Sequence, residues 1–384
     1  MLIAALAALA VASWLYLLVG RGGFWLCRER DISVSAPPVR WPAVAAIVPA
    51  RNEVEYIAAS IGSLLKQDYP GTLTLILVDD DSDDGTAALA QSAAAQSGSQ
   101  RPLTLVASRG VSPGWTGKLW ALKQGIDAAR SLPRPPEYLL LTDADIAHTP
   151  DSVRALVARA ESGDLVLTSL MAKLRCESFA ERSHVPAFVY FFQMLFPFAW
   201  ANAPDRTTAA AAGGCMLVKS QALARAGGVE RIRGALIDDC SLARLMKSVG
   251  LTWLGLTERV QSLRRYDTLD DVRAMISRSA YAQLNYSPVL LAATTLGLAL
   301  TFLAAPLLAL FGTGPARLLG AAAFALMTLS FQPILRFYRR SPLWGLALPA
   351  IAFAYMLYTL DSAVRYARGQ GGQWKGRVQA NATP

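Results

Sequence analysis

Two aspartates one residue apart, Asp143 and Asp145, follow the apolar run 138–141 after a single threonine in the stretch YLLLTDADIAHTP. An apolar run of this kind is typical of a buried strand, and one Asp would be enough to begin the turn after it. Neighbouring carboxylates repel each other unless a cation or hydrogen-bond donors hold them together. Their hard oxygens favour Mg²⁺ or Mn²⁺, which bridges one or two carboxylates to the phosphates of a ligand. Taken alone, the pattern fits an ordinary turn as well as a metal–diphosphate site.

Polar residues end two earlier apolar runs in the same way. Ala50, Arg51 and Glu53 lie at the end of the first run, and Asp79 and Asp80 lie at the end of the second. Ligands of parallel sheets bind beyond the carboxyl ends of the strands. We therefore expect these residues to lie on one edge of a sheet together with the aspartate pair described above, although Glu53 could equally be a first-turn helix residue.

Three more charged residues stand where helices are predicted to begin. Lys118 precedes one helix and could hold phosphates as a point charge, or simply be solvated. Asp238 and Asp239 begin another helix, and N-capping explains one aspartate there more readily than two. A carboxylate at this place could take the proton of an attacking group.

The elements that must position these residues alternate between strand-like and helix-like patterns. Apolar runs of strand length are followed by segments with helical spacing, and later runs such as DLVLTSL and GCMLVKS are further strand candidates. This alternation predicts an α/β fold with a mostly parallel sheet covered by helices on both faces.

The two ends of the chain are much more apolar than the middle. The 384 residues are 53% hydrophobic with a mean hydropathy of +0.31, which is too apolar for an ordinary soluble protein. The run 2–20 is uncharged and long enough to span a bilayer, which takes about 20 apolar residues. Basic residues follow this run and none precede it, which favours a signal anchor over a cleaved signal peptide. The positive-inside rule then places the middle domain in the cytoplasm, on a multi-pass protein of the inner membrane.

The predicted organisation follows from these patterns. In order, it comprises a transmembrane signal anchor (1–20), a basic juxtamembrane linker (21–42), a catalytic domain (43–265), an interfacial linker (266–287), about three transmembrane helices (288–360) and a basic tail (361–384). The apolar runs near the C-terminus are 288–311, 316–335 and 343–360. If all of them cross, the basic tail lies outside, against the charge rule. Either one run is re-entrant or the tail breaks the rule.

Composition excludes several other classes of site. The net charge of +9 fits a membrane protein with basic cytoplasmic segments, and no nucleic-acid motif accompanies it. The four cysteines form no CxxC pair, so neither a zinc site nor a disulfide framework is indicated. The two histidines, His148 and His184, are too few for a histidine-rich metal site.

Several motifs in this order resemble family 2 glycosyltransferases of the GT-A fold. The resemblance rests on PARNE at 49–53, VDDDSDDGT at 78–86, the D-x-D at 143–145, GWTGKLWAL at 114–122 and IDDCSLARLMKSVG at 237–250. The stretches PGWTGKLWAL, LRCESFAER, FFQMLFPFAWAN, AAAAGGCMLV and RGALIDDCSLARLMK are similar to the bacterial hopanoid-associated glycosyltransferases. That likeness covers roughly 40–311.

The resemblance implies a role for each candidate residue. Asp79 and Asp80 would contact the base and ribose of a nucleotide-sugar donor, for which we expect a UDP-sugar, beside Ala50, Arg51 and Glu53. Asp145 would bind the divalent metal, with Asp143 either assisting it or holding the ribose of the donor, and Lys118 would bind the phosphates. Asp239 aligns with the catalytic base of an inverting transfer, and Asp238 stands where the family usually has Glu. Asp81 stands where the family commonly has Gly, so we expect its side chain to face solvent.

Two segments after the catalytic motifs bear on the acceptor. The segment 184–202 has many aromatics and no Lys, Arg, Asp or Glu, which favours an interfacial segment that receives a lipid over a buried core segment. The segment 276–288 has no clean match to the Q/R-x-x-R-W block of many relatives, which leaves candidates only: Arg278, Tyr281, Gln283 and Tyr286.

The sequence therefore predicts a membrane enzyme that moves a sugar from a nucleotide to a lipid, for which the resemblance implies a hopanoid. One alternative is a nucleotidyl- or phosphosugar transferase, against which the second acidic site at Asp238 and Asp239 argues. The other is a non-enzymatic membrane scaffold, which has no reason to keep converging carboxylates.

Overall fold

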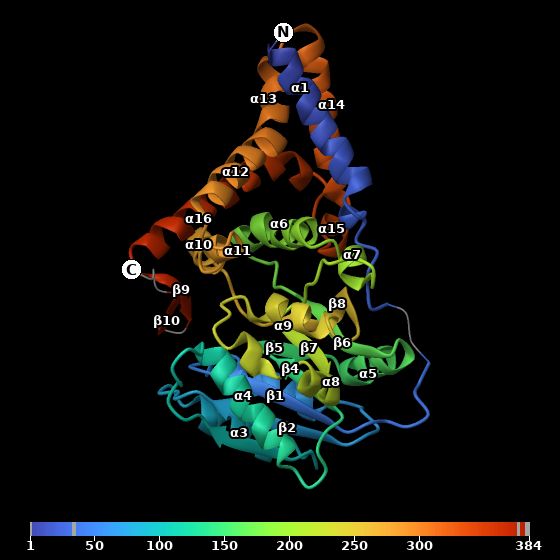
Figure 1. The fold of residues 1–384 in the computed structure, drawn as a ribbon, viewed down its shortest axis with the longest axis vertical. Helices are drawn as coiled ribbons and strands as arrows, with labels where there is room; N and C mark the ends of the chain where they lie inside the picture. The colour runs from blue at the N-terminus through green and yellow to red at the C-terminus, as the bar shows by residue number, and fades with distance from the viewer. Residues whose placement is uncertain (1, 33–35, 375–376, 381–384) are drawn as a thin grey trace.

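The computed structural model describes residues 2–32, 36–374 and 377–380. A sheet with helices on both faces forms one end of the molecule, and long apolar helices project from the other end to an apex near the N-terminus (Figure 1). Parts of two predicted segments lie outside the described residues: 33–35 of the juxtamembrane linker, and 375–376 and 381–384 of the basic tail.

The sheet has eight strands in the order β3-β2-β1-β4-β7-β6-β8-β5. The strands are β1 (Val44–Ala50), β2 (Leu73–Asp79), β3 (Leu103–Ala107), β4 (Tyr138–Thr142), β5 (Ile146–His148), β6 (Leu165–Lys173), β7 (Cys215–Lys219) and β8 (Leu251–Ser262). The strands β3, β2, β1 and β4 are mutually parallel, as expected from their continuous apolar character. Their carboxyl ends therefore meet on one edge.

Alternating side chains of the sheet bury against helices on its two faces. On β1, Val44 and Val48 pack with α2 (Ile57–Leu65) and α5 (Ser152–Ser162), whereas Ile47 packs with helices of the opposite face. The other helices of the sheet domain are α3 (Thr86–Gln96), α4 (Gly117–Arg130), α8 (Ser220–Arg225) and α9 (Asp238–Lys247).

The second half of the sheet is mixed rather than parallel throughout. β7 runs antiparallel to both β4 and β6, and the short β5 runs antiparallel to the end of β8. A parallel neighbour requires a long crossover, whereas an antiparallel one does not. The fold is thus the predicted, mostly parallel GT-A sheet with two antiparallel strands added.

A layer of helices separates the sheet from the projecting helices. This junction layer consists of α6 (Phe179–Leu195), α7 (Phe198–Asn202), α10 (Leu269–Ser277) and α11 (Ala280–Gln283). The segment 184–202 is mostly buried in this layer, which favours the core alternative over an interfacial segment with its aromatics at headgroup depth. Val185, Tyr190 and Phe191 of α6 are buried against the apolar helices, since Tyr190 stacks edge-on against Phe331 and its hydroxyl lies 2.7 Å from the Ser330 hydroxyl.

Among the described residues, four helices are long and apolar enough to cross a membrane. The candidate spans are Ile3–Gly20, Pro288–Phe311, Gly314–Phe337 and Trp344–Ala367, as the hydropathy pattern predicted. They comprise α1 (Leu2–Leu15) with a π-helical turn, α12 (Pro288–Leu298) and α13 (Ala305–Phe311) joined by another, α14 (Gly314–Ser330) with α15 (Gln332–Phe337), and α16 (Trp344–Ala367). The Trp14 indole packs on Phe302 and donates to the Thr301 carbonyl at 2.8 Å, so the first helix is part of the bundle.

The last helix, α16, differs from the others because both of its ends touch the junction layer. Trp344 at its start packs near Phe179 of α6, the Tyr355 hydroxyl donates to the His184 carbonyl at 2.9 Å, and Ser362 near its end accepts from the Tyr281 amide at 3.0 Å. The helix therefore lies along the junction layer and leads to β9 (Gly371–Trp374), which lies on the side of that layer that faces the sheet domain in Figure 1.

Candidate active site

The aspartate pair lies in the tight turn between β4 and β5, at the edge where the parallel strands end. Because β5 pairs with the end of β8, the chain after β8 is brought against this turn, and the Leu263 amide donates to the Asp145 carbonyl at 2.8 Å. The guanidinium of Arg264 then meets Asp145, with Nε 2.6 Å from Oδ2. The same guanidinium reaches both carboxylate oxygens of Glu53, at 2.8 and 2.9 Å. Arg264 thus holds the carboxylates of two strand ends together.

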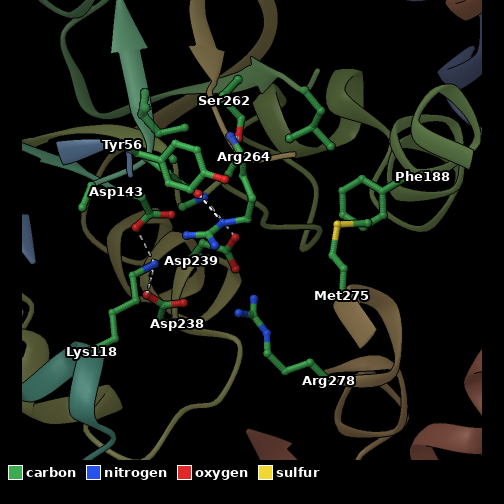
Figure 2. A pocket seen from close by; sticks show the side chains of 18 of the residues that line it. Tyr56, Lys118, Asp143, Phe188, Asp238, Asp239, Ser262, Arg264, Met275 and Arg278 are labelled. Atoms are coloured by element: carbon green, nitrogen blue, oxygen red, sulfur yellow. Dashed lines mark hydrogen bonds and ion pairs between the residues drawn. The ribbon is translucent and has the colours of Figure 1, made fainter. Parts of the chain in front are cut away.

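Lys118 likewise holds two other carboxylates of the site together, those of Asp143 and Asp238. It lies in the first turn of α4, and its Nζ lies 2.8 Å from Oδ1 of Asp143 and 3.2 Å from Oδ2 of Asp238. Burial alone would lower the pKa of Lys118, but Asp143 and Asp238 outweigh it and raise the pKa. The lysine therefore stays charged and bridges the two acidic motifs, as Figure 2 shows.

Asp238 and Asp239 form the first turn of α9. Oδ2 of Asp239 accepts from the Gly213 amide at 3.1 Å, and its Oδ1 accepts from the Cys240 amide at 2.7 Å. Burial raises the pKa of Asp239 to about 6, with the charge of Asp238 acting in the same direction and Lys118 opposing it. This carboxyl is therefore poised to exchange a proton near neutral pH, which a general base requires.

The other residues predicted to bind the nucleotide-sugar donor lie beside the cluster of Lys118, Arg264 and their carboxylates, not within it. Arg51 Nη1 donates to the carbonyls of Asp80 and Asp81 at 2.5 and 2.9 Å, and the Asp80 amide donates to the Ala50 carbonyl at 2.8 Å. Oδ1 of Asp79 is buried without a hydrogen-bond partner in the described part of the chain. The ends of β1 and β2 are thus tied together by Arg51.

Asp81 confirms the expectation drawn for it. Its φ of 59° lies in the left-handed region that favours glycine, and its side chain is 82% exposed. The residue therefore stands in a turn where a Gly would fit without strain, and its carboxylate faces solvent.

One cavity of about 570 Å³ contains most of these groups. Its charged part is lined by Glu53, Lys118, Asp143, Asp145, Asp238, Asp239 and Arg264. Its other wall is apolar and comes from β6 and the junction layer, with Met171, Leu174, Phe188, Phe192 and Met275. Figure 2 shows Phe188 and Met275 on the far side of the cavity from Lys118 and Asp143. The cavity therefore has a charged side, which we call the acidic floor, and an apolar wall opposite it.

The carboxylate oxygens of the aspartate pair suit a hard divalent ion whose coordination is completed by phosphates of a bound substrate. Among the described residues, no group of three or more His, Cys, Asp or Glu side chains is arranged to hold a metal ion. Mg²⁺ and similar ions in phosphate-binding sites take one or two carboxylates, with substrate phosphates and waters as the remaining ligands. Asp143 and Asp145, both on the cavity wall, suit such a site.

The remaining candidates separate into structural and site residues. His148 is buried, its Nε2 lies 3.0 Å from the Thr142 hydroxyl, and burial lowers its pKa to about 4, so it is a neutral part of the core. Tyr281 and Tyr286 pack against Tyr366 of α16 and do not line the cavity, and neither does Gln283. Arg278 does line it.

Sequence reasoning missed Arg264, Arg265 and Tyr266, which also line the cavity. The stretch LRRY directly after the last strand was the available signal. It is weak by itself, because basic residues after a strand are common and the β5–β8 pairing that brings Arg264 to Asp145 has no sequence pattern of its own.

The fold and the site define a glycosyltransferase. Residues 45–227, just under half of the chain, match the model of the Glycosyl transferase family 2. This match argues against the non-enzymatic scaffold.

Three known proteins illustrate what the chain is similar to. An undecaprenyl-phosphate mannosyltransferase of Micrococcus luteus is 30% identical over 127 residues, which is 33% of this chain. The match spans 47% of that relative, or about half its length. A mannosyltransferase of Pyrobaculum calidifontis, solved with GDP-Man and Mn²⁺, matches 93% of this chain and 99% of its own with a TM-score of 0.58 at 20% identity, which is a likeness of fold. A glucosyl-3-phosphoglycerate synthase of Mycobacterium tuberculosis, solved with Mn²⁺ and UDP-glucose, matches 64% of this chain and 78% of its own with a TM-score of 0.40 at 18% identity.

Proposed function

We propose that the protein is a membrane-bound inverting glycosyltransferase that moves a sugar from a nucleotide-sugar donor to a membrane lipid. The observation that carries the proposal is the cavity in which the carboxylates of Asp143, Asp145 and Asp239 face an apolar wall of Phe188 and Met275. A donor needs the first part and a lipid needs the second. The wall belongs to helices that pack directly under the apolar bundle.

The donor would lie across the ends of β1, β2 and β4. The buried and unpartnered Oδ1 of Asp79 suits an N–H of the base, and Asp80 suits the ribose. Arg51, next to Ala50, holds the backbone of this turn in place. The sequence resemblance implies a UDP-sugar, whereas the similar Pyrobaculum protein was solved with GDP-Man.

The diphosphate would lie over the aspartate pair. Asp145, with Asp143, would bind a Mg²⁺ or Mn²⁺ ion, which stabilises the charge of the leaving diphosphate as a Lewis acid. Lys118 adds a fixed positive charge next to Asp143. Arg264, which pairs Asp145 with Glu53, is placed to contact the same phosphates.

Asp239 would take the proton of the attacking acceptor oxygen. Backbone amides fix both of its oxygens, and its raised pKa makes it a competent base near neutral pH. Asp238 is occupied by Lys118 and would position that lysine. A single displacement with one base predicts inversion at the anomeric carbon.

The acceptor would reach Asp239 along the wall formed by Phe188 and Met275. The resemblance to hopanoid-associated enzymes implies a polycyclic lipid, while the similar Micrococcus protein is named for undecaprenyl phosphate. Both have an apolar body that suits this wall. At this level the proposed acceptor is a membrane lipid.

The test uses the full-length protein in phospholipid nanodiscs with UDP- and GDP-sugars that carry one label in the sugar and another in the β-phosphate. Hopanoid and polyprenyl-phosphate lipids serve as acceptors. We expect the sugar label alone to enter the lipid with inverted configuration, and EDTA or Asp145→Ala to abolish transfer. The matched control, Asp68→Ala, removes an exposed aspartate paired with Arg154 outside the site and should transfer normally. Both labels in the lipid would establish phosphosugar transfer, and full activity in EDTA would contradict the metal site.

A further inference from the structure

One basic side chain that lines the cavity, that of Arg278, forms no ion pair with the carboxylates of the described residues. Lys118 pairs with two carboxylates and Arg264 with two more, while Arg265 pairs with Asp267 at 3.2 Å. Arg278 lines the same cavity, and no carboxylate of the described residues lies within ion-pairing distance of it. Asp271, the other acid near the mouth, accepts instead from the amide and hydroxyl of Thr268.

The position of Arg278 is not explained by helix capping. It is the C-cap residue of α10, where a cation is favourable next to the last carbonyls. Its amide does donate to the Ala274 carbonyl at 3.2 Å, but its guanidinium makes no hydrogen bond to the helix among the described residues. Figure 2 shows that guanidinium pointing into the cavity, between the carboxylates and the apolar wall.

Arg278 therefore lies at the boundary between two environments. Met275, one turn earlier on α10, and Phe188 of α6 form the apolar wall beside it. A lipid that follows this wall toward Asp239 must pass its head group by the guanidinium. An unpaired guanidinium on such a path fits phosphate better than a hydroxyl, because its planar donors match two phosphate oxygens.

We propose that the acceptor lipid carries a phosphate in its head group and that Arg278 binds this phosphate. The inference rests on the proposed function and makes its acceptor more specific: an anionic phospho-lipid rather than a neutral polycyclic alcohol. When a phosphate oxygen attacks, its bond to the anomeric carbon forms as the bond from that carbon to the donor diphosphate breaks. The proton of the phosphate monoanion passes to Asp239, and the nucleoside diphosphate leaves.

Binding is tested first and without catalysis. The purified full-length protein is heated in detergent with undecaprenyl phosphate or with undecaprenol, which has the same chain and no phosphate. A ligand that binds the folded state raises the Tm. We expect the phosphate lipid to raise the Tm more than the alcohol does, and Arg278→Gln to remove that difference while Arg278→Lys restores part of it. The control, Arg273→Gln, lies on the same helix but pairs with Asp270 and does not line the cavity, so it should behave as wild type.

Sugar-transfer assays then distinguish the phosphate inference from the proposed glycosyltransferase function. Losing a charge-assisted hydrogen bond should raise the KM for undecaprenyl phosphate at least roughly tenfold in Arg278→Gln, with donor affinity unchanged. Equal Tm shifts for both lipids would overturn the phosphate inference, even if sugar reaches a neutral lipid and the proposed function stands. Phosphate-dependent binding without transfer to any lipid would instead refute the proposed function. A loss of donor affinity in Arg278→Gln would assign this arginine to the donor diphosphate and overturn the inference.

Discussion

At the scale of single residues, Asp239 is distinguished from Asp238 by its partners. Asp239 is held by two backbone amides, whereas Asp238 is an ion-pair partner of Lys118. The amides and Lys118 favour the charged form of Asp239, but burial and the charge of Asp238 outweigh them and raise the pKa of Asp239. This difference in partners favours Asp239 over Asp238 as the proposed base.

Asp239→Asn should keep the shape of this side chain and lose its basicity. We expect transfer to fall by roughly 10²–10⁴-fold, the usual contribution of a positioned general base. Donor affinity, measured by calorimetry, should survive because Asp79, Asp80 and Asp145 lie on other elements. Asp238→Asn should have a smaller effect on transfer. If the effects are reversed, Asp238 is the base, and if both variants lose donor affinity, the pair belongs to the nucleotide site.

The pH dependence follows from the same carboxyl. Since its pKa is raised to about 6, Asp239 is a base above that pH and becomes protonated below it. The transfer rate at saturating substrates should fall as the pH drops through about 6. Asp238→Asn removes a neighbouring negative charge, so it should lower the pKa of Asp239 and shift the fall to lower pH. A pH profile with the same midpoint in both proteins would show that another group controls the rate.

Arg264 illustrates what a sequence cannot reveal about a site. The acidic motifs were recognisable because each follows an apolar run, and Glu53, Asp143 and Asp145 do meet as expected. Arg264 is 119 positions from Asp145 and reaches it only through the pairing of Ile146 with Ser262. That register depends on the whole sheet and not on any local pattern.

At the scale of elements, α6 connects the chemistry to the membrane helices. Glu181 in its first turn is fully buried and accepts from the amides of Glu177, Ser178 and Tyr266 at 2.7, 3.0 and 2.9 Å. Its carboxylate thereby fixes the start of α6 to the loop that follows Arg264. The helix that carries the wall residues is therefore hydrogen-bonded to the loop that carries Arg264.

Glu181→Ala should loosen this attachment. It removes the acceptor of three part-buried backbone amides and an ion-pair partner of Arg175, which destabilises the folded state. We expect a lower Tm and a higher acceptor KM, with a smaller change in donor affinity. Glu177→Ala is the matched control, because Glu177 is exposed and makes only a surface ion pair with Arg175. Equal Tm values for the two variants would argue against the role of Glu181.

The same helix shows why apolar composition alone was misleading. The segment 184–202 lacks charge and contains proline, which suits a membrane interface as well as a core. The structure buries it because α15 and α16 cover the face that would otherwise meet lipid. Coverage by elements more than 100 residues later is a tertiary property, as is the antiparallel insertion of β7.

At the scale of the whole molecule, α16 offers a solution to the charge conflict at the C-terminus. If α16 lies along the junction layer rather than crossing, the basic tail returns to the side of the sheet domain, as the positive-inside rule favours. The earlier spans would then place both the sheet domain and the tail in the cytoplasm.

Cysteine labelling of intact cells tests this topology in a cysteine-free variant. Reporter cysteines at Gln96 in the sheet domain and at Gln370 in the tail should stay unmodified by an impermeant reagent. A reporter at Thr313, between α13 and α14, should be labelled. Labelling at Gln370 alone would show that α16 crosses the membrane. Labelling at Gln96 would overturn the orientation of the catalytic domain.

The attachment of the sheet domain has a kinetic consequence. The domain is held at the bundle from both sides, because the N-terminal linker joins β8 through the Asp31 amide and the Leu256 carbonyl at 3.0 Å, while α6 and α10 pack against the C-terminal helices. An active site fixed in this way meets its acceptor by lateral diffusion in two dimensions. Its rate should then follow the mole fraction of acceptor in the leaflet, so that diluting the bilayer with inert phospholipid slows turnover even when the amount of acceptor per millilitre is unchanged.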